Sequence, residues 1–227
     1  MNCLLCNNDL YHSITLKDFF SFQPYRADSV CKSCTSRFAR IDSNSRCPGC
    51  GRSQEEQNLC ADCKKWQLHY PAAFTQHEAM FRYDDALREW LHTYKIQGDI
   101  RYANVFRSQL RHYCQQNKKR TVIPLPISKK SLEERGFNQC EWLLEQAGIP
   151  YQQLLIHTQT GKKQSEKNRR ERLAASQPFE VLPHTLGQDT PLLLFDDLYT
   201  TGRTMLYAKE ALHEAGFKNI LSFSIGR

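Results

Sequence analysis

Four cysteine pairs near the N-terminus constrain the fold of this 227-residue chain more than any other feature. In each pair two residues separate the cysteines, so both sulfur atoms can face one metal ion across a tight turn. Two such turns complete a tetrahedral four-thiolate zinc site, and so regular a repeat argues against redox motifs or disulfides. The spacing predicts two zinc ions, held by Cys3, Cys6, Cys31, Cys34, Cys47, Cys50, Cys60 and Cys63.

The spacing does not decide how the four pairs combine. In the simplest arrangement the first two pairs hold one ion and the last two hold the other, but the spacing also permits a cross-braced arrangement. A four-thiolate site has no open coordination position, so the predicted role of both ions is structural. A segment of this size with few large apolar side chains also folds poorly without a metal. We therefore expect a small double zinc-ribbon lobe over residues 1–70.

Composition excludes two broad classes of protein. Apolar residues make up 40% of the chain, which can fill a core. However, no apolar run approaches the roughly 20 residues that a membrane-spanning helix needs. The N-terminal residues also lack the basic start and long apolar run of a signal peptide. We expect a cytoplasmic protein with no membrane span.

Positive charge is concentrated in two stretches. The formal net charge is +7, and residues 101–135 and 156–175 carry +7 and +4 of the local excess. Residues 1–66 are formally +2, and eight thiolates with two zinc ions bring them to about −2. The basic stretches suit an acidic partner such as nucleic acid, although a solvated surface explains them as well. The metal-loaded lobe is a poor candidate for non-specific phosphate binding.

Residues 71–227 alternate between predicted strands and helices. Short apolar runs at 121–126, 191–195 and 220–225 predict strands. Apolar residues at helical spacing predict helices over 84–98, about 100–116, 138–147 and from about 204 to Gly216. This alternation predicts an α/β domain with a mostly parallel, doubly wound sheet.

The stretch from Leu192 to Thr204 carries the clearest chemistry. A buried strand delivers Asp196 and Asp197 at its C-terminal edge, where ligands bind in open α/β sheets. The next turn, at 200–204, places hydroxyl and backbone N–H groups at a helix N-terminus, which favours anions. Carboxylates beside an anion site suit a sugar phosphate, because the acids bind ribose hydroxyls or Mg²⁺ and the turn binds the phosphate.

This stretch resembles the phosphoribosyl-pyrophosphate loop of type I phosphoribosyltransferases. In that family the two acids contact the ribose 2′- and 3′-hydroxyls, and the Thr-Thr-Gly turn holds the 5′-phosphate. The resemblance implies phosphoribosyl pyrophosphate, with Mg²⁺, or ribose 5-phosphate as the ligand. The implied binding residues are Asp196, Asp197, Tyr199, Thr200, Thr201, Gly202, Arg203 and Thr204.

Three further features resemble the ComF/GntX family of competence proteins. These are the double zinc ribbon, the run Arg135–Gln139 after the 121–126 strand, and the basic stretch 164–175. The resemblance covers nearly the whole chain and implies a phosphoribosyltransferase-like domain over residues 71–227. It also implies a single-stranded DNA ligand and a ComFA-like helicase/ATPase partner. The implied contacts to DNA or pyrophosphate are Arg135, Asn138, Arg169, Arg170 and Arg172.

Two functions follow from these patterns. The first, which the full-length resemblance favours, is a competence protein that assists the cytosolic handling of incoming single-stranded DNA. The second is an active phosphoribosyltransferase with an unknown acceptor base. The chain has no recognisable loop for a particular nucleobase, so the sequence assigns no catalytic residue.

Overall fold

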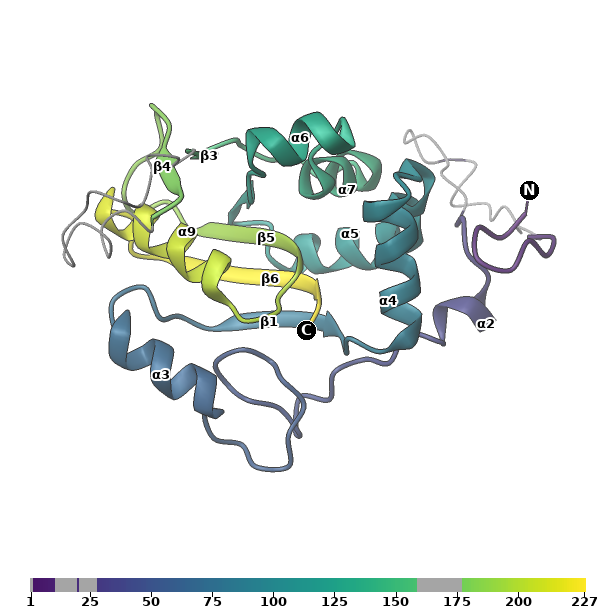
Figure 1. Cartoon of the computed structure of the whole chain (residues 1–227), viewed down its shortest axis with the longest axis horizontal. Coiled ribbons are helices and arrows are strands. Elements are labelled where there is room, and N and C mark those ends of the chain that lie inside the picture. Colours follow the sequence, from purple (N-terminus) through teal and green to yellow (C-terminus); the bar gives the residue numbers. More distant parts are fainter. Residues whose placement is uncertain (1, 11–19, 21–27, 159–176) are drawn as a thin grey trace.

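A four-stranded parallel sheet lies at the centre of the computed structural model, which describes residues 2–10, 20, 28–158 and 177–227 (Figure 1). The strand order is β1-β6-β5-β2, and all three pairings are parallel. The prediction of an α/β fold with a mostly parallel sheet is confirmed. The strands are β1 (His77–Phe81), β2 (Thr121–Pro124), β5 (Leu192–Leu198) and β6 (Ile220–Gly226), and β3 (Leu155–His157) and β4 (Phe179–Val181) form a separate antiparallel pair.

The register places the ends of the strands at one edge of the sheet. Pro124 of β2 pairs with Phe195 of β5, and Asp196 pairs with Ser224 of β6. Since the strands are parallel, the segments that follow β2, β5 and β6 all leave from this edge. Residues far apart in the chain therefore meet beside Asp196 and Asp197.

Helices follow the predicted segments, but not all are regular. Asp84 caps α4 (Asp85–Leu91) by accepting a hydrogen bond from the Leu87 amide. The chain then continues as a π-helical turn, η1 (His92–Ile96), and a 3₁₀ segment, η2 (Ile100–Phe106), before α5 (Arg107–Gln116). The sequence predicted uniform helices in this region. The remaining helices are α2 (Lys32–Thr35), α3 (Ala61–His69), the unpredicted α6 (Lys129–Arg135), α7 (Gln139–Ala147) and α9 (Arg203–Glu214).

The apolar core has two parts, one on each side of the sheet. In the first, Trp90, Phe106 and Leu143 pack with Phe195 and Phe223. In the second, the apolar stripe of α9 packs on the sheet. The helix contributes Met205, Ala208 and Leu212, and the strands contribute Ile123, Leu194 and Ile220. Helices on both sides explain why β5 begins with a continuous apolar run rather than an alternating pattern.

The two cysteine groups belong to different parts of this core. Cys3 and Cys34 are buried in the first part, next to Phe38. Cys47, Cys50 and Cys63 are buried in the second part, the one that contains the apolar residues of α9. In Figure 1, α2 and α3 accordingly lie far apart, at two different sides of the sheet. The division of the chain at residues 70/71 stays a prediction.

No helix within the described part of the chain is long and apolar enough to cross a membrane.

Candidate phosphoribosyl site and zinc centres

The eight paired cysteines form two compact groups that follow the sequence order. Within each group the four sulfur atoms all lie within 4.8 Å of one another. The Sγ atoms of Cys6 and Cys31 are 3.8 Å apart, as are those of Cys50 and Cys60. A tetrahedral site with Zn–S bonds of about 2.3 Å has sulfur atoms about 3.8 Å apart. Both groups therefore fit a structural zinc ion, and the cross-braced alternative is wrong.

Asp197 is the more buried of the two acids at the end of β5. It is 2% exposed, and its carboxylate accepts hydrogen bonds of 2.9 and 3.3 Å from the Lys95 ammonium group. Burial opposes the charge of Lys95, but the Asp197 charge and these hydrogen bonds raise the pKa of Lys95 above its usual value. The Lys95 ammonium group is thus a positive charge held permanently beside the two acids.

Asp196 lies beside this ion pair and is less covered. Its Oδ1 accepts a hydrogen bond from the Asp197 amide at 2.9 Å and lies 3.6 Å from the Cys140 sulfur atom. Burial, and next the Asp197 charge, raise the pKa of Asp196 well above its usual range. A hydrogen-bond donor or a cation on the ligand would stabilise its ionised form.

Lys95 is a site residue that was not predicted from the sequence. It comes from η1, 102 residues before its partner. The one available signal was its position four residues after Leu91, which places a charged side chain beside the buried stripe of a helix. Single π-helical turns also occur often at functional sites. Lys95 lies within this irregular turn, and its side chain reaches the acid pair from there.

The turn after β5 has the geometry that anion binding requires. Gly202 has φ +81°, and a Cβ atom there would overlap the Tyr199 hydroxyl group, so glycine is needed on both counts. The first intrahelical bond of α9 runs from the Leu206 amide to the Gly202 carbonyl. The N–H groups of the first turn, at 203–205, therefore have no partner within the helix. Outside it, the Arg203 amide donates a long hydrogen bond, of 3.4 Å, to the Thr201 hydroxyl oxygen. The side chains of Thr200, Thr201 and Thr204 are exposed beside them.

Two carbonyl groups of this turn accept hydrogen bonds from residues near the second cysteine group. The Trp66 indole donates to the Thr201 carbonyl at 2.9 Å, and the Arg227 guanidinium donates to the Thr200 carbonyl at 2.7 Å. Arg227 also donates to the Cys50 sulfur atom at 3.3 Å. The second cysteine group is thus joined to the turn through the Arg227 side chain. No sequence pattern indicated that Trp66 and Arg227 contribute to the site.

Two residues expected to bind the phosphoribosyl group have other contacts. Tyr199 is buried between His77 and the Arg227 guanidinium, with its hydroxyl group against Gly202, so it supports the turn by packing. Arg203 is exposed, but its Nε donates to the Tyr207 hydroxyl group at 2.8 Å along α9.

The run Arg135–Gln139 joins α6 to α7. Asn138 caps α7, with its Oδ1 accepting from the Cys140 amide and its Nδ2 donating to Leu125 and Glu141. Arg135 donates to Gln139 at 3.0 Å. These bonds fix the start of α7, where the Cys140 sulfur atom contacts Asp196. The run therefore supports the acid pair and is not shown to contact a ligand itself. Arg169, Arg170 and Arg172 lie outside the described residues.

Comparison with known proteins supports one family. No family model matches the chain. Competence protein ComFC of Streptococcus pneumoniae (strain ATCC BAA-255 / R6) is 36% identical over 231 aligned positions, covering 100% of both chains. Competence protein ComFC of Bacillus subtilis (strain 168) is 32% identical over 231 positions, covering 99% of this chain and 94% of that one. With this level of identity along the full length of both chains, the protein belongs to the ComFC family of competence proteins.

Proposed function

We propose that this protein acts in natural transformation by handling incoming single-stranded DNA in the cytoplasm. We also propose that residues 196–204, at the end of β5 and the start of α9 (the β5–α9 edge), bind a phosphoribosyl group. The competence role is supported by two relatives named competence proteins, each matched along nearly its full length. A ComFA-like helicase/ATPase is the proposed partner. The basic segments, with Arg135, Arg169, Arg170 and Arg172, are the proposed DNA contacts.

One observation carries the ligand proposal. Two acids end a buried strand, and a glycine-containing turn follows within five residues, leading to helix N–H groups that have no partner within the helix. Ribose hydroxyls would donate to Asp196, and the 5′-phosphate would accept from the amides at 203–205 and the nearby threonine hydroxyls. A ribose 5-phosphate group has these two features at its opposite ends.

The charges of the site refine this proposal. Lys95 offsets the charge of Asp197, and a lysine ammonium group has three N–H donors, of which two bond Asp197. The third can reach a ligand oxygen, because the Lys95 side chain is 23% exposed. Mg²⁺ bound with phosphoribosyl pyrophosphate would neutralise its pyrophosphate oxygens. Asp196 as acceptor and the third N–H group of Lys95 as donor would together hold the ribose in one orientation.

Phosphoribosyl transfer is the second candidate function. It is favoured by the retention of the acids and the whole turn at 200–204, which a protein binding DNA alone would not need. The acceptor and a catalytic base are not assigned.

Calorimetric titration of the full-length protein tests the ligand proposal. Phosphoribosyl pyrophosphate with Mg²⁺ and ribose 5-phosphate should both bind. Asp196→Asn should weaken both roughly 10- to 100-fold, since a hydrogen bond to a charged group contributes about 1.5–3 kcal/mol. Asp189→Asn, at an exposed acid in a distant turn, is the control. Equal affinity of the two variants would refute the site.

A further inference from the structure

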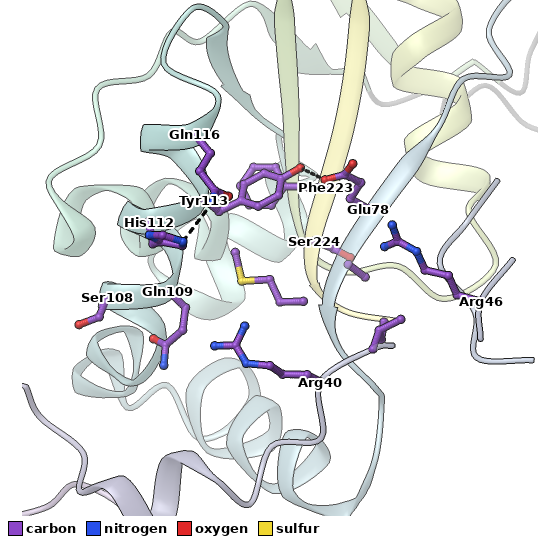
Figure 2. A pocket seen from close by; sticks show the side chains of 13 residues that line it. Arg40, Arg46, Glu78, Ser108, Gln109, His112, Tyr113, Gln116, Phe223 and Ser224 are labelled. Carbon is purple, nitrogen blue, oxygen red and sulfur yellow. Dashed lines mark hydrogen bonds between the residues drawn. The ribbon is translucent and has the colours of Figure 1, made fainter. Parts of the chain in front are cut away.

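A second cavity lies away from the β5–α9 edge (Figure 2). Its volume is about 540 Å³, within the range of small-molecule sites. Its walls are β1, β6, α5 and the linking segment, residues 35–46, which joins the two cysteine groups. None of the residues proposed to bind the phosphoribosyl group lines it.

The linking segment is held against the edge of the sheet by backbone bonds. The Ile41 amide donates to the Met80 carbonyl, and the Arg82 amide donates to the Ala39 carbonyl. Further along, Arg46 forms an antiparallel bridge with Ser53. These bonds place Arg40 and Arg46 at the cavity on a fixed backbone rather than on a free loop.

Arg40 and Arg46 have no ion-pair partner among the described residues. By contrast, Arg37 and Arg52, from the same region, pair with Glu89 and Asp62. The acid that lines the cavity, Glu78, accepts a hydrogen bond from the Tyr113 hydroxyl group at 2.7 Å, as Figure 2 shows. The cavity therefore has two guanidinium groups without an ion-pair partner and one acid that is already bonded. The Arg40 guanidinium lies over the Phe81 ring, a contact that leaves its N–H groups free to donate. Guanidinium groups bind phosphate oxygens through paired N–H donors.

The opposite wall offers a hydrogen-bond acceptor. Gln109 extends from α5 on the side facing Arg40 in Figure 2. Its Oε1 is buried and has no hydrogen-bond partner among the described residues. A buried acceptor without a donor costs about 1–3 kcal/mol, which a donor on a ligand would recover. Ala79 and Met80 provide an apolar surface between these polar groups.

We propose that this cavity binds a nucleotide, with its phosphate on Arg40 and Arg46 and an N–H or O–H group of its base or sugar donating to Gln109. The nucleotide is either a free mononucleotide or one unit of a nucleic-acid strand. A neighbouring cavity shares Arg40, Ser108 and Gln109 and adds Lys32, so a strand has room to continue. It also contains Asp28, whose carboxylate accepts a hydrogen bond of 2.7 Å from the Ser108 hydroxyl group. The net charge of residues 1–66 concealed this site, because the negative charge resides on the thiolates while Arg40 and Arg46 line the cavity.

Calorimetry at low salt with the full-length, zinc-loaded protein tests this proposal. The probes are thymidine 5′-monophosphate and oligothymidylates of increasing length. Arg40→Gln combined with Arg46→Gln should weaken binding at least about tenfold, since two charge-assisted phosphate contacts are lost. Arg37→Gln combined with Arg52→Gln removes the same charge from paired arginines and should change affinity less than about twofold. Gln109→Leu should lower the affinity for the mononucleotide, because the acceptor for its N–H or O–H group is lost.

The probes also identify the source of the nucleotide. Similar affinity for the mononucleotide and the strands indicates a free nucleotide. Affinity that rises with length and falls in Lys32→Gln indicates a strand. The proposal is wrong if neither probe binds, or if the Arg40/Arg46 variant binds as tightly as the wild type while retaining its zinc and melting temperature.

A further measurement separates this site from the phosphoribosyl site. Asp196→Asn should bind both nucleotide probes as the wild type does, and the Arg40/Arg46 variant should bind ribose 5-phosphate normally. Loss of nucleotide binding in Asp196→Asn would place the nucleotide at the β5–α9 edge and overturn this inference.

Discussion

The two cysteine groups share one ligand spacing but have different neighbours. The first, with Cys3 and Cys34, packs against Phe38 and the helices of the first core part, and Leu4 nearby accepts a hydrogen bond from Tyr102. The second touches the proposed phosphate turn through Cys50, Arg227 and Trp66. Identical zinc motifs can therefore have unequal consequences, because the residues that surround a metal centre decide what depends on it.

The proposed ligand site is divided in the same way. Its acid half is built from the first core part, where η1 supplies Lys95 and α7 supplies Cys140. Its phosphate half is supported from the second cysteine group. Because the two halves have different supports, substitutions should be able to weaken the ligand contacts of one half without changing those of the other.

Breaking the second zinc centre should have the largest effect. Cys50→Ser should release one zinc ion and weaken ribose 5-phosphate binding at least about 100-fold, because structural zinc contributes about 10–16 kcal/mol in small domains. Cys6→Ser should also release one zinc ion but leave ligand affinity within about twofold, since structure distant from the site adds independently. Metal analysis and calorimetry measure both. Equal loss of affinity in the two variants would break the comparison.

Removing the cation of the acid half should rank second. Lys95→Met leaves Asp197 buried without a partner, which costs about 3–5 kcal/mol of unfolding free energy. Because the pKa of Lys95 is raised in the folded state, its contribution is fully present below about pH 10.4 and is lost as the pH rises through the folded value. The stability difference from the wild type should thus be constant from about pH 6 to 9 and narrow above about pH 10.4.

Chemical denaturation across this pH range measures the Lys95 effect. Lys130→Met, at an exposed lysine of α6, is the matched control. Zinc content should remain that of the wild type, because Lys95 touches neither cysteine group. A pH-independent difference that persists above pH 11 would show that the ammonium charge is not responsible.

Loss of the Arg227 contacts should have an intermediate effect. Arg227→Met removes the donors to the Thr200 carbonyl and the Cys50 sulfur atom, and each such bond contributes about 0.5–1.5 kcal/mol or more. We expect both zinc ions to remain and ribose 5-phosphate affinity to fall roughly tenfold. Arg82→Met, at an exposed arginine, should bind normally. If Arg227→Met lost its zinc as well, the turn and the metal centre would be one unit rather than two joined ones.

The smallest effect is expected for the indole contact. Trp66→Phe keeps the ring but loses the bond to the Thr201 carbonyl, so affinity should fall by roughly threefold to tenfold, for about 1 kcal/mol. Trp142→Phe is the matched control, because its indole makes a similar bond to the Ile100 carbonyl. Calorimetry compares the two, and an equal loss in both would mean that the Trp66 bond has no specific part in ligand binding.

The sequence by itself determined those features that depend on short stretches of chain. The two-residue gap between paired cysteines already implies a four-thiolate centre, because the distance between the sulfur atoms follows from one tight turn. The run from Leu192 to Thr204 likewise contains a strand, two acids and a helix start in succession, so its chemistry is readable without a partner.

Tertiary structure alone decided which groups meet those local features. Lys95 lies 102 residues from Asp197, Trp66 lies 135 from Thr201, and Arg227 lies 177 from Cys50. No periodicity encodes such contacts, since they depend on the order of strands in the sheet and on the side of the sheet that each segment covers. Arg40 and Arg46 became candidate ligands for the same reason: two arginines in a linker acquire a function only where the fold places them around a cavity.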